Sequence, residues 1–148
     1  MFSGRQRFVY SIAAGDFEHG GDATTQLKGE LDRLGVNKSL IRRVVIIAFE
    51  GEINIIVYST SGGEMTVEVS DGYIDLSFQD SGPGIVDVEQ AMTAGFSTAP
   101  DWAIELGFGA GMGLGNMREN ADLFEIESAP DKWTLVHCRI DRRDHDLK

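Results

Sequence analysis

Alternating apolar and polar residues predict β-strands in the first half of this chain. Residues 5–14 alternate in this way and predict a strand at the edge of a sheet. Residues 64–70 and 73–79 alternate cleanly on either side of Asp71-Gly72. Because an Asp-Gly pair between two alternating runs is among the strongest short signals for a β-hairpin, we predict that these runs pair with each other.

Apolar residues at helical spacing predict two helices between the edge strand and the hairpin. Residues 23–35 carry leucines at 27, 31 and 34, with Asp22 as the predicted N-cap and Gly35 closing the helix. Residues 39–59 are ambiguous, because their many β-branched side chains favour a strand. Their length, about twenty residues, exceeds that of a single strand, so we predict a helix.

The second half of the chain has less regular patterning. In order along the sequence we predict a sharp turn at 80–84, a short helix at 86–92, a loop at 94–108, a helix at 111–123, and closing strands at 124–128 and 132–140. The order of elements predicts an α+β fold, a two-layer α/β sandwich with helices on one face of a mixed sheet. We expect one domain over residues 1–148, with a charged tail at about 141–148.

Composition excludes several classes of function. The formal net charge of −11 argues against a nucleic-acid partner, which would need clustered Lys and Arg. A single nucleotide remains compatible, because backbone N–H groups and a metal can hold it inside an acidic protein. The one cysteine, Cys138, lies in an apolar stretch and predicts a buried thiol. The three His residues are scattered and predict no zinc site.

No segment predicts a membrane span. The longest uninterrupted apolar run, residues 44–49, is far too short to cross a bilayer. Arg5 and Arg7 precede a few apolar residues, faintly like a signal peptide, but the alternation there favours a strand. We therefore expect a cytoplasmic protein.

Glycines at alternate positions from 107 to 115 are the most unusual feature of the sequence. No register of this run gives the glycine spacing of a dinucleotide fingerprint, and no lysine supplies a P-loop. A glycine loop that enters a helix can present free N–H groups to an anion such as a triphosphate. The glycines alone leave two alternatives open, an anion-binding loop and a hinge without a ligand.

Two further motifs carry polar side chains that suit a nucleotide. Asp80 ends an alternating strand and is followed by Gly82 and Gly84, so its carboxylate can accept a hydrogen bond from an exocyclic amine. Taken alone, the motif favours an ordinary Asp-Gly turn. Glu50 and Asn54, at positions i and i+4, would share a helix face. Asn54 would offer Mg²⁺ an amide oxygen and Glu50 could accept a proton, unless both belong to a solvated polar face.

In this order and spacing the three motifs resemble the nucleotide site of the GHKL superfamily, which includes histidine-kinase catalytic domains, gyrase, MutL and the anti-sigma-factor serine kinases. The resemblance covers about residues 5–140. It implies a Bergerat ATP-binding fold. It further implies that ATP and Mg²⁺ are the cofactors, with Glu50 as general base, Asn54 as the Mg²⁺ ligand and Asp80 on the adenine.

The resemblance also implies a set of residues around the nucleotide. These residues are Asn54, Asp80, Gly82, Gly84, Ile85, Gly107, Gly109, Ala110, Gly111, Met112, Gly113, Leu114 and Thr134. Thr134 corresponds to the late-strand threonine that supports the adenine pocket, although Trp133 precedes it where the family usually has glycine. Residues 99–106 lengthen the lid beyond that of the switch kinases.

The length of the chain favours one branch of the superfamily. A free-standing domain of 148 residues, with the phrase Gly95-Phe-Ser-Thr98, resembles the anti-sigma-factor and switch-protein serine kinases. The resemblance implies transfer of phosphate from ATP to a Ser or Thr of a STAS-domain protein, with a sigma factor or another regulator as a further partner. Kinases of this kind often pair, so a homodimer is a further expectation.

The alternatives are a nucleotide-gated protein that sequesters its partner without turnover, an ATPase regulatory domain of a sensor complex, and a glycine-rich structural protein without a ligand.

Overall fold

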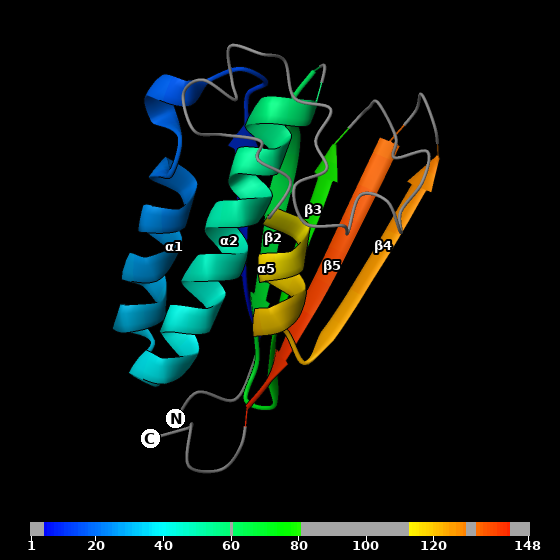
Figure 1. Ribbon diagram of the computed structural model, residues 1–148. Coiled ribbons are helices and arrows are strands. Elements are labelled where there is room, and N and C mark those ends of the chain that lie inside the picture. Colours follow the sequence, from blue (N-terminus) through cyan, green and yellow to red (C-terminus); the bar gives the residue numbers. More distant parts are fainter. Residues whose placement is uncertain (1–4, 60, 81–112, 130–132, 143–148) are drawn as a thin grey trace.

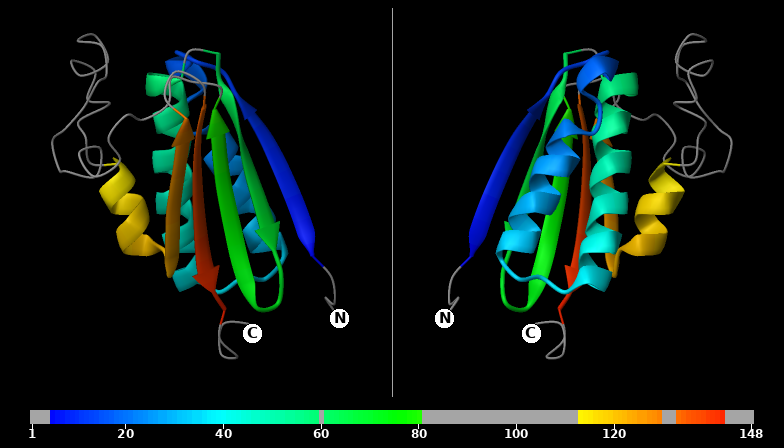
Figure 2. Two further views of the ribbon diagram at one scale, coloured as in Figure 1. Left: turned by 90° about the vertical axis from the view of Figure 1, so that its right-hand side faces the viewer. Right: turned by 90° about the vertical axis from the view of Figure 1, so that its left-hand side faces the viewer.

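The chain folds into two layers, a five-stranded sheet with helices on one face (Figures 1 and 2). The computed structural model describes residues 5–59, 61–80, 113–129 and 133–142. The elements are β1 (Gln6–Ile12), a short 3-10 helix (Phe17–His19), α1 (Asp22–Arg33), α2 (Lys38–Tyr58), β2 (Gly63–Val69), β3 (Tyr73–Asp80), α5 (Gly113–Asn120), β4 (Leu123–Ala129) and β5 (Trp133–Asp141). The predicted α+β sandwich and the predicted hairpin around Asp71-Gly72 are confirmed, and the two predicted closing strands pair as β4 and β5.

The sheet has the order β1-β2-β3-β5-β4, and all neighbouring strands that the structure describes are antiparallel. The prediction of a mixed sheet is therefore wrong for these strands. The reason lies in the connections: β2–β3 and β4–β5 are hairpins, which reverse direction. Between β1 and β2 the chain passes through two helices, so each element again reverses the one before it (Figure 1).

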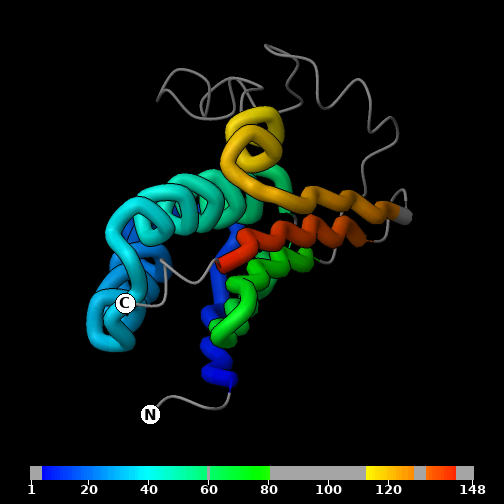
Figure 3. The backbone as a smooth tube through the Cα atoms, turned by 90° about the horizontal axis from the view of Figure 1, so that it is seen from below, coloured from blue at the N-terminus to red at the C-terminus, as the bar shows by residue number. Residues whose placement is uncertain are grey.

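Residues 39–59, where propensity and length disagreed, lie in helix α2. The β-branched residues suit this helix because it is enclosed by α1, α5 and the sheet, and Val44, Ile47 and Ile55 are buried (Figure 3). A helix that is apolar on most sides belongs in a protein interior, where packing overrides helix propensity. Asn37 caps its start, since its side chain accepts a hydrogen bond of 2.8 Å from the Ser39 backbone N–H.

Helix α1 begins at Asp22, but Asp22 is not its N-cap as predicted. Gly21 occupies the cap position with a φ of 96°, and as a glycine it has no side chain that could cap the helix. The carboxylate of Glu52 on α2 receives the free N–H groups instead. The predicted end is confirmed, because Gly35 has a φ of 73° and the Val36 N–H donates to the Leu31 carbonyl.

Helix α2 lies very close to β3 at Gly51. A Cβ built on Gly51 would overlap the ring of Phe78, whose side chain is buried. The absence of a side chain at position 51 therefore allows the helix to rest on the sheet at this point.

Gly51→Ala is expected to destabilise the fold by about 1–3 kcal/mol, although alanine is the better helix former. The matched control is Gly29→Ala in α1, where a Cβ would meet nothing within 4 Å. That change should stabilise by about 0.5–1 kcal/mol. Urea unfolding of both variants measures the two signs, and destabilisation of equal size in both would contradict the packing argument.

Several predictions concern residues at the margins of the described ranges. The predicted helix 86–92, the loop 94–108 and most of the charged tail lie outside the described residues. Of the helix predicted at 111–123, the structure describes Gly113–Asn120; residues 111–112 lie outside the described residues, and the helix ends before 123 because β4 starts at Leu123. Among the described helices none is both long and apolar enough to span a bilayer. Cys138 is fully buried, as predicted, and burial raises the pKa of its thiol to about 12.

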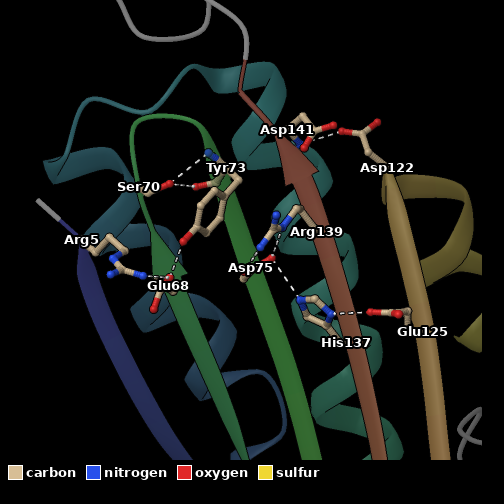
Figure 4. A network of polar contacts seen from close by, with 10 residues as sticks. All are labelled: Arg5, Glu68, Ser70, Tyr73, Asp75, Asp122, Glu125, His137, Arg139 and Asp141. Carbon is tan, nitrogen blue, oxygen red and sulfur yellow. Dashed lines mark hydrogen bonds and ion pairs between the residues drawn. The ribbon is translucent and has the colours of Figure 1, made fainter.

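The face of the sheet opposite the helices carries a network of charges centred on Asp75 (Figure 4). Arg139 donates to both carboxylate oxygens of Asp75 at 2.8 Å, and its guanidinium lies 4.2 Å from the ring centre of Tyr73. The ring nitrogens of His137 lie 3.1 Å from Asp75 Oδ1 and 3.0 Å from Glu125 Oε1. Burial acts to raise the pKa of Asp75, but the hydrogen bonds from Arg139 and His137 hold it below its ordinary value.

This depressed pKa predicts a stability contribution that depends on pH. A carboxylate whose folded pKa lies below its unfolded pKa stabilises the fold above the unfolded value, about pH 4, and loses that contribution as pH falls through the folded pKa. The difference in free energy of unfolding between wild type and Asp75→Asn should therefore be largest near neutral pH and shrink below about pH 4. Urea unfolding across this range measures it, and a constant difference down to about pH 2 would contradict the assignment.

Candidate functional site

The predicted site residues that the structure describes lie on α2, on α5 and at the facing ends of β3 and β5 (Figure 1). Helix α5 lies beside α2 and runs in the opposite direction (Figures 1 and 3). The side of α2 that faces α5 carries Glu50 and Asn54. Their i, i+4 spacing thus places both side chains on one helix face, as the sequence predicted.

Each of these two side chains contacts a residue of α5. The Asn116 Nδ2 donates a hydrogen bond of 2.6 Å to Glu50 Oε2. The Asn54 Nδ2 lies 3.9 Å from the sulfur of Met117, which is fully buried. Glu50 and Asn54 are themselves only partly buried, so each keeps access to a ligand.

The described end of the glycine run lies directly against Asn54. A Cβ built on Gly113 would stand 3.1 Å from Asn54 Oδ1 and 3.4 Å from Asn54 Nδ2. Contacts this short are rare for a real Cβ, so glycine at 113 allows the backbone of α5 to approach the amide. Leu114, the next residue, packs against the hydrophobic core and fixes the start of the helix.

Asp80 and Thr134 are neighbours across β3 and β5. They are register partners, and the Thr134 backbone N–H donates to Asp80 Oδ1 at 3.2 Å. Thr134 is buried, with 6% of its surface exposed, and its hydroxyl lies 3.5 Å from that of Ser128. On the other side Asp80 pairs with Gly63, where a Cβ would stand 3.0 Å from the Asp80 Cα. The end of β3 is therefore closely enclosed by both neighbouring strands.

Asn54 and Asp80 lie at the same end of the two layers. Gly51 contacts Phe78, and from there α2 and β3 run in the same direction (Figure 1). Asn54 lies three residues further along the helix, ~4.5 Å. Asp80 lies two residues further along the strand, ~6.6 Å, on the same face as Phe78. The amide and the carboxylate thus lie toward the same end of α2 and β3.

These residues fit a magnesium-bound nucleotide. An ionised Asp only accepts hydrogen bonds and suits the exocyclic amine of a base. The oxygen of Asn54 is a hard donor that suits Mg²⁺, and the glycine at 113 brings a helix start next to it. The other predicted nucleotide contacts lie outside the described residues: Gly82, Gly84, Ile85, Gly107, Gly109, Ala110, Gly111 and Met112.

The sequence analysis missed two residues of this region. Asn116 directly follows the glycine run, and an amide one helical turn after Gly113 predicts a polar contact with α2. Glu52 lies on the side of α2 opposite Glu50, where its carboxylate contacts the start of α1, and the sequence analysis assigned it no role. A carboxylate in such an apolar helix had to find buried donors, and this was the available signal.

Comparisons with known proteins identify the family of this chain. The sequence pattern of the family described as "Histidine kinase-, DNA gyrase B-, and HSP90-like ATPase" matches residues 39–144. Three similar proteins are named anti-sigma F factor. The protein of Pasteuria penetrans is 36% identical over 73 residues, covering 49% of this chain and 45% of that protein. The protein of Heyndrickxia coagulans is 29% identical over 118 residues, 77% of this chain and 74% of that protein. The protein of Thermoanaerobacter sp. (strain X514) is 35% identical over 98 residues, 65% of this chain and 59% of that protein.

Two solved structures share the fold at low sequence identity. A chain of the SiaB–SiaC complex from Pseudomonas aeruginosa has a TM-score of 0.55 at 12% identity, covering 91% of this chain and 89% of its own. The histidine kinase AdeS from Acinetobacter baumannii has a TM-score of 0.52 at 14% identity, covering 93% of this chain and 68% of its own. The chain spans about half the length of the Pasteuria and Thermoanaerobacter relatives. With a family pattern that covers most of the chain, and with the fold and site geometry that go with it, this protein belongs to the histidine kinase-, DNA gyrase B- and HSP90-like (GHKL) ATPase family.

Proposed function

We propose that this protein is a Mg-ATP-dependent serine/threonine kinase of the anti-sigma switch type, which phosphorylates a small STAS-like regulatory protein. The observation that carries the proposal is the common face of α2, where Glu50 and Asn54 both point at the start of α5. A base and a metal ligand one helical turn apart suit a reaction in which alignment and charge neutralisation supply most of the catalysis. The names of the similar proteins, anti-sigma F factors, support the same class.

Each of the site residues has a defined task in this proposal. Asp80, held by the Thr134 backbone N–H, accepts a hydrogen bond from the adenine amine. Asn54 would hold Mg²⁺ through its amide oxygen, and N–H groups of the glycine run would neutralise phosphate charge. Glu50 accepts the proton of the attacking hydroxyl. ATP supplies the phosphoryl group that is transferred.

The proposed class of kinase also implies which proteins this chain binds. The acceptor is a STAS-like protein, and a sigma factor is a second partner that the kinase binds. Phosphorylation of the first would decide which partner is held. The proposed reaction uses ATP of the cytoplasm. We also expect two copies of the chain to form a homodimer.

The test is incubation of the purified chain with γ-labelled ATP, Mg²⁺ and each STAS-domain protein encoded by the same genome. The proposal expects label on a Ser or Thr of one of these proteins. A tight complex with a STAS protein or a sigma factor but no phosphoprotein would replace it with nucleotide-gated sequestration. Phosphate release that no acceptor protein alters would indicate an ATPase regulatory domain, and calorimetry without ATP binding would exclude all three.

Gly113→Ala tests the approach of α5 to the proposed metal ligand. The added Cβ would press on Asn54 Oδ1, so the affinity for ATP should fall by roughly 10-fold in the presence of Mg²⁺. The matched change is Gly115→Ala in the same helix, where a Cβ meets nothing within 4 Å and a much smaller effect is expected. Calorimetric titrations with Mg²⁺ and with EDTA measure both variants. Equal losses in the two variants would contradict a specific contact between Gly113 and Asn54.

A further inference from the structure

Glu50 is held by a side chain to which neither the family resemblance nor the proposed mechanism gives a role. Asn116 lies one helical turn after Gly113 on α5 and donates its Nδ2 to Glu50 Oε2 at 2.6 Å. A carboxylate accepts hydrogen bonds only, so the amide nitrogen, and not its oxygen, faces Glu50. Both residues are partly buried, so this hydrogen bond is only partly screened by water.

The position of Asn116 is fixed by the rest of α5. Asn120 donates to the Asn116 carbonyl at 2.9 Å, and Arg43 of α2 donates to the Asn120 carbonyl at 2.9 Å. Arg43 also reaches Asp122 at 3.2 Å, and Met117 is fully buried beneath the helix. These contacts dock α5 on α2 without using Glu50. The bond from Asn116 to Glu50 is therefore an addition to a helix that is already anchored.

We propose that Asn116 is a positioning residue that holds Glu50 in the rotamer needed to accept a proton. An unrestrained glutamate at a partly exposed position samples several rotamers, and a base out of hydrogen-bond reach of its proton does not act. The bond to Asn116 occupies one carboxylate oxygen and leaves the other for the hydroxyl. This inference rests on the proposed role of Glu50 as general base.

One helical turn of α5 contacts both the proposed metal ligand and the proposed base. Gly113 lies against Asn54, and Asn116, three residues later, holds Glu50. The turn of α5 that sets the proposed metal ligand therefore also sets the proposed base. Displacement of this turn would disturb both, whereas loss of the Asn116 amide alone would disturb only the base.

The experiment uses two replacements of Asn116 in the full chain. Asn116→Leu removes the donor with little change of size, and Asn116→Asp is isosteric but replaces the donor with a charge that repels Glu50. The control is Glu119→Ala, an exposed residue of the same helix. For each variant we would measure phosphate transfer to the STAS-domain acceptor, the calorimetric Kd for Mg-ATP, and the melting temperature.

The expected result is a loss confined to turnover. Both Asn116 variants should lower kcat by about 10- to 100-fold, Asn116→Asp more than Asn116→Leu, with Kd for Mg-ATP within about twofold of wild type. In a Glu50→Ala background the same replacements should cause no further loss, because Asn116 acts only through Glu50. Unchanged kcat in both variants, or additive losses in the double variants, would overturn the inference.

A spectroscopic readout separates this inference from the proposed function. The side-chain amide protons of Asn116 are expected to shift in a ¹H–¹⁵N spectrum on Glu50→Ala and to stay in place on Glu119→Ala. If Glu50→Ala leaves phosphorylation intact, the proposed base is wrong whatever the amide protons show. If Glu50→Ala abolishes phosphorylation but the Asn116 protons and kcat do not respond, the base stands and the positioning role is wrong.

Discussion

Glu50→Ala is expected to retain Mg-ATP binding within a fewfold and to lower phosphate transfer to a protein hydroxyl by about 10²- to 10⁴-fold. The split follows from geometry. Glu50 lies on the α5-facing side of α2 and bonds to Asn116, whereas Asn54, one turn later, stands against the end of the glycine run. The two positions should thus divide into turnover and binding.

The measurement is a time course of phosphoprotein at saturating Mg-ATP, with calorimetry on the same samples. Glu64→Ala is the control, since it removes an exposed carboxylate of β2 that alternates with the buried Met65 and therefore lies on the sheet face away from the helices. Asn54→Ala should give the opposite split, with weaker Mg²⁺-dependent binding. Wild-type rates in Glu50→Ala would remove Glu50 from its proposed role.

Patterns within single segments predicted most of the fold. The alternation at 64–70 and 73–79 around Asp71-Gly72 gave β2 and β3, because a two-residue turn fixes the register of a hairpin. The long segment 39–59 could be assigned on length, although its composition favoured a strand. Strand directions depend on how many helices intervene between strands and on which strands pair, and no local pattern records that. The mixed sheet was predicted wrongly for this reason.

The contacts that shape the site lie between segments far apart in sequence. The spacing of Glu50 and Asn54 predicted a shared face, but not that α5 covers it. The contacts of Gly51 with Phe78 and of Gly113 with Asn54 depend on how two elements pack against each other. A glycine within a helix does not show from the sequence which residue lies next to it. The family resemblance placed Asp80 and Thr134 separately at the adenine, and the register of β3 and β5 brings them together.

The opposite side of α2 from Glu50 carries the residue on which the largest stability effect is expected. Glu52 is 2% exposed, and its carboxylate accepts hydrogen bonds from the start of α1. Its Oε2 receives the N–H groups of Gly21 at 2.9 Å and Ala23 at 3.3 Å. Its Oε1 receives the Thr24 N–H at 3.1 Å and the Thr24 hydroxyl at 2.7 Å. A carboxylate at a helix N-terminus also interacts favourably with the helix dipole.

Glu52→Ala should lower the free energy of unfolding by about 3 kcal/mol or more, because it leaves buried donors without acceptors. Glu52→Gln keeps one accepting oxygen and should lose less. Glu50→Ala is the matched control, since it removes the same side chain from the same helix, two residues earlier, and breaks one partly buried contact. Urea unfolding ranks the three variants, and hydrogen exchange at residues 21–24 should accelerate only in the Glu52 variants. Equal urea midpoints for Glu52→Ala and Glu50→Ala would show that the cap adds nothing. The expected ranking instead divides α2 into a side that binds α1 and a side that carries the site. For this reason replacement of Glu52 should lower stability, whereas replacement of Glu50, only two residues earlier, should lower phosphate transfer.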